Sequence, residues 1–323
     1  MSILNHELKW YRSQVVSNTS ANGGRLSINQ IVDSVKNNLF PDVTETERTA
    51  GLTRYRKAFL KIVNTDNEML SNAIVHLLTV TPADDYITMF EGTHVDTQAN
   101  ISSPTEYGAG GLASSVESGV TEFDVNVKHT DMIIFRTGDR IYISDGVNEE
   151  YHDNVSISKS GTVVTITLDT GSQLANAYAA DSVVASCIEI GDIDYSIDDF
   201  NVVSTGGTYN ETNNIVVDNI GGIFENWTLT FTGVSTFTCA GSVIGSVGSG
   251  SVNSNYSPTN INFARPYFTL NSIGFGGSWV IGDTITFTTV PRNVPIWFKK
   301  VVPALSASYS GNNFDFRILG ETA

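Results

Sequence analysis

The sequence predicts a mainly β protein, built from antiparallel β-sandwich or β-barrel modules and preceded by an N-terminal arm that is partly helical. From Thr53 onward, apolar and polar residues alternate with a period of two in many short runs, which is the pattern of half-buried strands. Clusters of Gly, Asn, Asp and Ser separate these runs, as turns between antiparallel strands require. Only 16% of the residues are charged, so Ser, Thr, Asn and Gly must cover much of the surface.

The N-terminal arm, residues 1–52, differs from the rest of the chain. Residues 28–40 predict a helix that begins at Ser27, because their apolar side chains recur at helical spacing. These side chains are Ile28, Ile31, Val32, Val35 and Leu39. Thr44 and Glu47 have the spacing of a capping box, which predicts a second short helix. The arm has too few apolar residues for a core of its own, so we expect it to pack on another surface.

Two stretches that lie far apart in the sequence are expected to form one domain. Residues 53–104 contain three strand patterns and residues 291–323 contain two more. Neither stretch has enough strands to complete a sheet alone. Pairing them gives a discontinuous β-sandwich domain, an arrangement that is common because chain termini are often close in space.

The middle of the chain is expected to form two modules inserted into this domain. Residues 105–190 carry short strand patterns separated by turns, which predicts a small β-barrel or β-sandwich. Within it, Ser158–Gly161 has the composition of a hairpin turn. Residues 191–290 predict a second β-rich module, in which residues 240–262 form a loop dominated by Gly, Ser and Asn.

Charge is unevenly spread along the chain. Residues 1–61 carry nine lysines and arginines against five acidic residues, a net charge of +4. Since the whole chain has a net charge of −16, residues 62–323 carry a net charge of −20. Binding to nucleic acid requires neutralised phosphates, so this acidic body excludes nucleic acid as an expected partner. A basic segment on an acidic protein predicts docking onto an acidic protein surface, such as a neighbouring copy. A solvated fluctuation of charge is the alternative, and both stay open.

Trp10 and Tyr11 lie in the arm, outside any predicted core. Exposed aromatic residues are costly, and aromatic residues anchor interfaces, so this pair is a candidate for contact with another subunit. The basic residues of the same segment are candidates for the same interface. The full set of candidate interface residues is Trp10, Tyr11, Arg12, Arg25, Arg48, Arg54 and Arg56.

Motifs that carry chemistry are lacking. The five histidines form no HExxH pattern, and the two cysteines, Cys187 and Cys239, have no metal or redox spacing. His76 lies within an apolar strand, where a packed histidine is more common than a metal ligand. His152 follows Glu150, but one histidine beside acidic residues in a hairpin is common without catalysis. We therefore predict no catalytic residue, no metal and no cofactor, and a protein that is not an enzyme.

The densest acidic cluster is at residues 192–199. It begins like the calcium loop of an EF-hand, but Ile197 stands where that loop needs Gly and Val203 stands where it needs Glu. A loose calcium site and a solvated acidic linker between modules stay open as interpretations, and the linker is favoured.

Membrane and secretion signals are also lacking. No stretch approaches the ~18–20 consecutive apolar residues of a membrane helix, so no membrane partner is expected. Lys9 and Arg12 interrupt the region where a signal peptide would carry its apolar core. We expect the protein to be made, and to assemble, in a cytoplasm.

Two parts of the chain, residues 20–95 and 225–323, resemble a family of virion structural proteins of tailed bacteriophages. The segments that carry the resemblance are 22–27, 37–43, 47–51 and 53–57, followed by Gly282–Phe287, Val294–Pro303 and Gly320-Glu321. Residues 105–200 show no such likeness. The resemblance implies a structural role in the virion, with the neck or collar of a contractile-tailed phage as the first choice, and it carries over no catalytic residue.

The resemblance also implies partners. The subunit would form a homo-oligomeric ring, dodecameric or related to a hexamer, and would contact the portal, the head–tail connector and the tail terminator. Many weak contacts then add up through repetition. Three alternatives stay open: a capsid decoration or head-fibre protein, a receptor-binding or baseplate protein that contacts host glycans through residues 191–262, and an enzyme that cleaves glycans.

Overall fold

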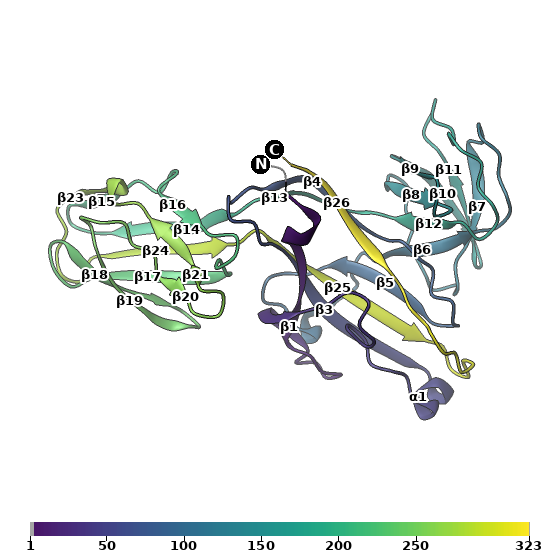
Figure 1. Ribbon diagram of the computed structural model, residues 1–323, viewed down its shortest axis with the longest axis horizontal. Coiled ribbons are helices and arrows are strands. Elements are labelled where there is room, and N and C mark those ends of the chain that lie inside the picture. The colour runs from purple at the N-terminus through teal and green to yellow at the C-terminus, as the bar shows by residue number, and fades with distance from the viewer. Residues whose placement is uncertain (1–2, 323) are drawn as a thin grey trace.

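The computed structural model describes residues 3–322 and contains three β-rich bodies arranged in a row (Figure 1). The central body comprises residues 3–104, 188–193 and 291–322. The right lobe comprises residues 105–187, and the left lobe comprises residues 194–290. The prediction of a mainly β fold is confirmed, since strands make up 47% of the chain and helices 5%.

The central body is built around a sheet to which both ends of the chain contribute. Its strands run in the order β5-β25-β3-β1-β2, and all neighbours are antiparallel. Their bounds are β1 (Leu8–Val15), β2 (Gly23–Gln30), β3 (Leu52–Ile62), β5 (Tyr86–Glu91) and β25 (Asn293–Val302). Because β25 lies between β3 and β5, Trp297 is paired with Lys57 on one side and with Phe90 on the other.

A second, three-stranded sheet covers one face of the first. Its order is β13-β4-β26, with β4 (Leu70–Leu77), β13 (Ile188–Ile193) and β26 (Phe316–Thr322). Phe298 and Ile296 of the first sheet pack with Val75 and Ile188 of the second, so the two sheets enclose a common apolar core. This arrangement is that of a β-sandwich.

The right lobe extends the same sheet and has a core of its own. Strand β6 continues from β5 through the pair Thr88 and Gly108, which makes one sheet of 12 strands. The strands of the lobe are β6 (Tyr107–Leu112), β7 (Glu122–Asn126), β8 (Ile141–Ser144), β9 (Glu149–His152), β10 (Ser156–Ser160), β11 (Val163–Thr167) and β12 (Val183–Ser186). The predicted hairpin is present between β10 and β11, where Gly161 has a φ of 62°.

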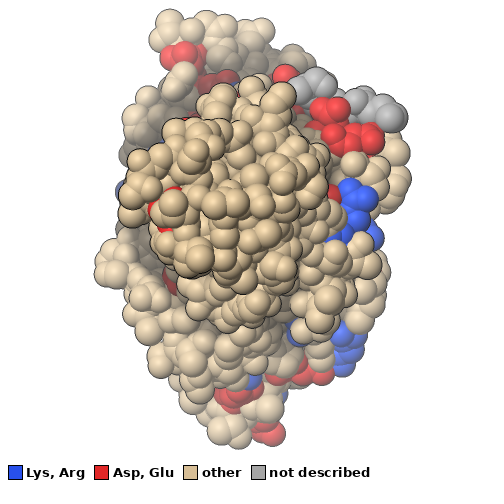
Figure 2. Space-filling view, turned by 90° about the vertical axis from the view of Figure 1, so that its left-hand side faces the viewer, with Lys and Arg blue, Asp and Glu red and all other residues tan. Residues whose placement is uncertain are grey.

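The left lobe contains a five-stranded sheet with an aromatic core. The order is β14-β24-β17-β18-β19, with β14 (Ser196–Val203), β17 (Glu225–Phe231), β18 (Thr236–Gly241), β19 (Gly245–Ser251) and β24 (Thr284–Val290). Short paired strands cover it: β15 (Gly207–Tyr209), β16 (Ile215–Val217), β20 (Thr259–Asn260), β21 (Arg265–Pro266), β22 (Phe268–Leu270) and β23 (Phe275–Gly277). Trp227, Phe237 and Phe268 are fully buried between these layers. The outer end of this lobe shows almost no charged side chain (Figure 2).

Helices are few and short. The capping box at Thr44 and Glu47 is present and begins α1 (Glu45–Ala50). The remaining helical turns are η1 (Asn5–Glu7), η2 (Gln98–Asn100) and η3 (Ser272–Gly274). Among residues 3–322, no helix has the length and apolar character needed to cross a membrane.

The predicted helix over residues 28–40 is wrong. Residues 23–30 form β2, and the chain then runs through turns to Phe40. The helical spacing misleads because its apolar residues do not share one environment: Leu39 is buried, whereas Ile28 and Val35 are exposed. Pairing of β2 with β1 overrides the local helical preference.

Candidate interaction site

The two aromatic candidates of the arm lie inside the central body, which corrects the expectation that they stand outside the core. Strand β1 pairs with β3, and its two faces place Trp10, partly buried, against the sandwich core and Tyr11 on the other side of the sheet, against the left lobe. Trp10 meets the ring of Phe316 edge-on, with 4.8 Å between ring centroids. Tyr11 is 8% exposed and packs against Phe263. Their role in contact with another subunit stays a prediction, and its original reason, exposure, does not hold.

The five arginine candidates donate to backbone carbonyls of their own chain. Arg12 donates to Asn38 O at 2.5 Å, Arg48 to Ser306 O at 3.2 Å, and Arg54 to Asp42 O at 3.3 Å. The remaining two are Arg25, which donates to Phe224 O, and Arg56, which donates to Ser17 O. The basic N-terminal segment therefore docks on its own chain. These partners could not be predicted from the sequence, because every residue has a backbone carbonyl group and a pattern of side chains does not indicate which one accepts a hydrogen bond.

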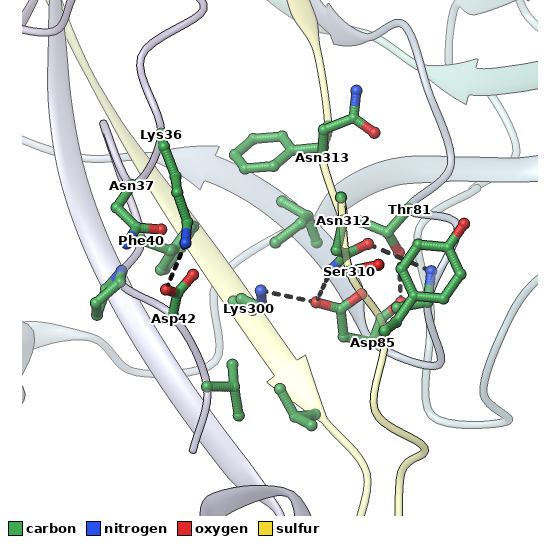
Figure 3. Close-up of a pocket in the computed structure, with 18 of the residues that line it drawn as sticks. Lys36, Asn37, Phe40, Asp42, Thr81, Asp85, Lys300, Ser310, Asn312 and Asn313 are labelled. Atoms are coloured by element: carbon green, nitrogen blue, oxygen red, sulfur yellow. Dashed lines mark hydrogen bonds and ion pairs between the residues drawn. The ribbon is translucent and has the colours of Figure 1, made fainter. Parts of the chain in front are cut away.

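Arg12, Arg48 and Arg54 hold the walls of a cleft in the central body. This polar cleft has a volume of about 810 Å³ and lies between residues 33–43, residues 81–85 and residues 306–315, with β25 beneath it (Figure 3). Its walls are loop segments, which Arg12 and Arg54 tie to the sheet and Arg48 ties to α1. The N-terminal arm thus shapes the cleft, and its residues 33–43 and Arg48 form part of the lining.

Ion pairs lie at the floor and at the rim of the polar cleft. At the floor, Lys300 Nζ lies 2.8 Å from Asp85 Oδ2, which also accepts a hydrogen bond from the Asn312 amide at 2.7 Å. At the rim, Lys36 Nζ lies 2.9 Å from Asp42 Oδ2, with both side chains exposed (Figure 3). The inner pair is nearly closed to solvent and joins β25 to the loops on both sides, whereas the outer pair is screened by water.

The lining of the polar cleft is acidic overall. Its lining residues include no histidine and no cysteine, so no side chain there has an ordinary pKa near neutrality or a thiol nucleophile. Its acidic residues outnumber its basic ones. The acidic ones are Asp33, Asp42, Asp84, Asp85 and Asp315, and the basic ones are Lys36, Arg48 and Lys300. A cleft of this composition suits a polar or basic partner.

A serine, a histidine and a glutamate meet on the right lobe. His152 Nδ1 lies 2.8 Å from Ser172 Oγ, and His152 Nε2 lies 2.9 Å from Glu150 Oε2. This order is the reverse of that in serine hydrolases, where serine bonds Nε2 and the acid bonds Nδ1. Glu150 also accepts hydrogen bonds from Ala175 N at 2.9 Å and from the Tyr178 hydroxyl at 2.8 Å. The group therefore holds β9 and residues 172–178 together through hydrogen bonds, and Glu150, His152 and Ser172 are called the clasp below.

The clasp keeps Glu150 ionised. Burial alone would raise the pKa of Glu150, but hydrogen bonds from Ala175 and Tyr178 outweigh it and lower that pKa below its ordinary value. The clasp residues do not line the polar cleft. The sequence shows His152 beside its acidic neighbours, but it does not indicate the contact with Ser172, which is 20 residues away.

The acidic segment at 192–199 connects the central body to the left lobe. Its side chains are dispersed: Asp192 accepts from Asn72 N, Asp194 pairs with Arg292, and Asp198 accepts from the Ser196 hydroxyl. Within residues 3–322, no group of three or more potential metal ligands is found. The segment thus serves as a hydrogen-bonded connection between two bodies.

Comparisons with known proteins give little information about the function of this chain. No protein-family model matches the chain, and no curated protein matches it. Among solved structures, VP17, a capsid protein of bacteriophage P23-77, is similar at a TM-score of 0.20 and 9% identity, over 78% of this chain and 87% of that one. The vicilin from Solanum melongena is similar at a TM-score of 0.11 and 7% identity, over 96% of this chain and 86% of that one. Similarity at this level carries no argument about function.

Proposed function

We propose that this chain is a structural, non-enzymatic subunit of a tailed-bacteriophage particle, placed in the neck or collar around the head–tail junction. The observation that carries the proposal is the position of β25 between β3 and β5. That pairing locks both chain ends into the central body and leaves two β lobes on opposite sides of it (Figure 1). A subunit of this form can contact two different neighbours while its own core stays rigid.

The resemblance of residues 20–95 and 225–323 to tailed-phage virion proteins supports the same role. So does the polar cleft, whose acidic lining suits a polar or basic partner. The small share of charged residues, 16%, is typical of assembled β proteins whose surface is covered by Ser, Thr and Asn. A portal, a connector and a tail terminator are the partners that this position implies.

Cryo-electron microscopy of the phage particle tests the proposal. We expect density for this chain in a ring at the head–tail junction, with a copy number near a dozen by quantitative mass spectrometry. Hundreds of copies on the capsid faces would instead identify a decoration protein. Density at the baseplate or fibre tips would identify a receptor-binding protein. Absence from purified particles would overturn the virion assignment itself.

A further inference from the structure

The floor of the polar cleft contains a buried carboxylate oxygen that has no hydrogen-bond donor. Asp85 lines the cleft and is only 3% exposed. Lys300 and Asn312 both contact its Oδ2, at 2.8 Å and 2.7 Å, and no donor among residues 3–322 reaches its Oδ1. Figure 3 shows this carboxylate group beside Lys300 and Asn312. A charged oxygen that is shielded from water and lacks a donor is costly, so it calls for a donor from a ligand.

The charge of the lining favours a cationic donor. Five acidic residues and three basic ones line the cleft, a net charge of −2. The two lysines each pair with one carboxylate, and Arg48 donates to a backbone carbonyl group. The three remaining aspartates form no ion pair with the residues that the structure describes, and they are Asp33, Asp84 and Asp315. A ligand with a positive charge would therefore be attracted to the cleft.

The walls that carry these carboxylates are fixed in place. Asp84 Oδ2 accepts a hydrogen bond from Ala307 N at 2.8 Å. Asn312 Oδ1 accepts one from Ala83 N at 3.3 Å, which joins the same two walls a second time. The cleft is thus preformed, and little conformational entropy is lost when a ligand enters it.

The size and the rim of the cleft favour a polypeptide segment over a small cation. The volume of about 810 Å³ lies within the range of about 300–1,000 Å³ that is common for ligand pockets, and a single ammonium ion would leave most of it empty. Val35 and Tyr309 also line the cleft and are 52% and 53% exposed, so they offer apolar contacts beside the carboxylates. An extended segment with a lysine or arginine between apolar residues supplies both kinds of contact.

The cation has to come from a different protein. The chain has 18 lysines and arginines, of which only Lys36 is exposed, whereas the others are buried or partly buried. Lys36 itself lies at the rim of the cleft and is paired with Asp42 at 2.9 Å. A second copy therefore has no free, exposed basic side chain to insert. Two copies also repel each other, because each has a net charge of −16.

We propose that the polar cleft binds an extended segment of a different protein through a lysine or arginine side chain. The cationic group of that side chain donates to Asp85 Oδ1 and lies between the carboxylates of Asp84 and Asp315, as charge-assisted hydrogen bonding requires. The inference deepens the proposed function by naming the chemistry of one partner, and it rests on that function in taking the partner from the particle. Repetition around a ring would multiply one weak contact.

A peptide titration tests the chemistry. The probe is the pentapeptide Gly-Val-Arg-Val-Gly, acetylated and amidated so that the guanidinium group is its only charge. The matched peptide has citrulline in place of arginine, which keeps the shape and removes the charge. In amide NMR spectra of the full chain, we expect the arginine peptide to shift signals of residues 81–85 and 306–315. It should bind about tenfold more tightly than the citrulline peptide.

Two double variants separate the cleft from the overall charge. Asp84→Asn with Asp315→Asn removes two exposed carboxylates of the cleft and should weaken binding of the arginine peptide about tenfold. Asp66→Asn with Glu117→Gln makes the same change in net charge at exposed positions outside the cleft and should leave binding unchanged. Both double variants should keep the melting temperature of the native protein, because all four side chains are exposed.

The floor of the cleft is tested by a pair of single variants with opposite expectations. Asp85→Asn removes the carboxylate that lacks a donor and should weaken binding of the arginine peptide about tenfold. Lys300→Met breaks the same ion pair but leaves the carboxylate in place, so it should bind the peptide at least as tightly as the native protein. A merely structural role of the pair would weaken binding in both variants.

Equal binding of the arginine and citrulline peptides, or no binding of either at millimolar concentration, would overturn the inference. So would a particle map in which the cleft holds solvent or a second copy of this chain. Either failure leaves the proposed function intact if the chain forms a ring at the head–tail junction. Absence of the chain from particles would count against that function, whereas binding of the arginine peptide would still support the site.

Discussion

The ammonium group of Lys61 donates a hydrogen bond to the carbonyl oxygen of Gly222 at 2.9 Å, and so joins the central body to the left lobe in the protein interior. Lys61 is fully buried, and its Nζ also lies 5.1 Å from the centre of the Phe263 ring. Arg292 and Asn219 strengthen the same junction through a hydrogen bond of 2.7 Å. The left lobe is thus fixed to the body by buried polar groups.

The stability of the protein should depend on the protonation of Lys61. Burial lowers the pKa of Lys61 from 10.5 to about 7, with Asp218 opposing that shift. Since the unfolded chain binds this proton more tightly, the contribution of Lys61 to stability is full above pH 10.5 and is lost as the pH falls towards 7. Urea unfolding should show this loss, with a slope of up to about 1.4 kcal/mol per pH unit.

Lys61→Met isolates this effect. We expect the difference in free energy of unfolding between the native protein and Lys61→Met to change steadily between pH 10 and pH 7, and to level off below 7. Lys36→Met is the control, because the Lys36 side chain is exposed. Parallel pH profiles for the native protein and Lys61→Met would contradict the prediction.

His76 should make the protein sensitive to acid. Its Nε2 lies 3.0 Å from the Tyr151 hydroxyl and its Nδ1 lies 3.0 Å from Leu77 O, in the core between the central body and the right lobe. Burial lowers the pKa of His76 from 6.5 to about 4. Stability is therefore full above pH 6.5 and falls by about 3 kcal/mol as the pH drops to 4.

His76→Gln should reduce the decrease in the free energy of unfolding between pH 6.5 and pH 4. Part of that decrease should persist, because burial lowers the pKa of His94 to about 4 as well. The exposed His6 provides the matched control, and His6→Gln should leave the profile unchanged. No change in His76→Gln would show that other groups govern acid unfolding, whereas loss of the entire acid-dependent decrease would show that His94 contributes nothing.

Trp297 should be a main contributor to the stability of the central body. It is fully buried, stacks with Phe90 at 6.3 Å and donates its indole N–H to Asp96 Oδ2 at 2.7 Å. Trp297→Ala should lower the free energy of unfolding by about 3–5 kcal/mol. Trp297→Phe keeps most of the packing and should cost less. An unchanged melting temperature for Trp297→Ala would contradict this placement.

Deletion of residues 1–24 should unfold the central body. From the sequence, a detachable arm would leave a folded body, but β1 pairs with β3 from Leu8 to Arg12 and places Tyr11 in the interior. Its loss exposes an edge of β3 and opens the apolar core. Circular dichroism and solubility of the truncated chain would test this, and a cooperative unfolding transition like that of the full chain would refute it.

The parts of the fold that follow from local chemistry could be predicted from the sequence. The capping box at Thr44 and Glu47 and the hairpin at Gly161 each depend on residues that are neighbours in the chain. Strand β1 could not be predicted from the sequence, because it forms through pairing with β3, about fifty residues away. Tertiary pairing of this kind outweighs the helical spacing that begins at Ile28.

The candidate site was less predictable than the fold. Composition showed that the N-terminal segment is basic, but the acceptors of Arg12, Arg48 and Arg54 are backbone carbonyls at Asn38, Ser306 and Asp42. A carbonyl group is common to every residue, so it gives no sequence signal. From the sequence, docking of the basic segment on a neighbouring copy and a solvated fluctuation of charge both stayed open, and the structure adds that these arginines bind carbonyl groups of their own chain.

The Ser172–His152–Glu150 group should contribute to stability and not to hydrolysis. Glu150→Gln places an amide N–H₂ where Ala175 N and the Tyr178 hydroxyl now donate, so we expect a loss of about 1–3 kcal/mol in the free energy of unfolding. Ser172→Ala removes one hydrogen bond to His152 and should cost about 0.5–1 kcal/mol.

A chromogenic ester assay separates the two roles. We expect the same background rate of hydrolysis for the native protein, Ser172→Ala and Glu150→Gln, because the serine bonds the imidazole nitrogen opposite to the one used in serine hydrolases. A clear rate for the native protein that Ser172→Ala abolishes, with its melting temperature nearly unchanged, would establish a catalytic serine and reject the clasp.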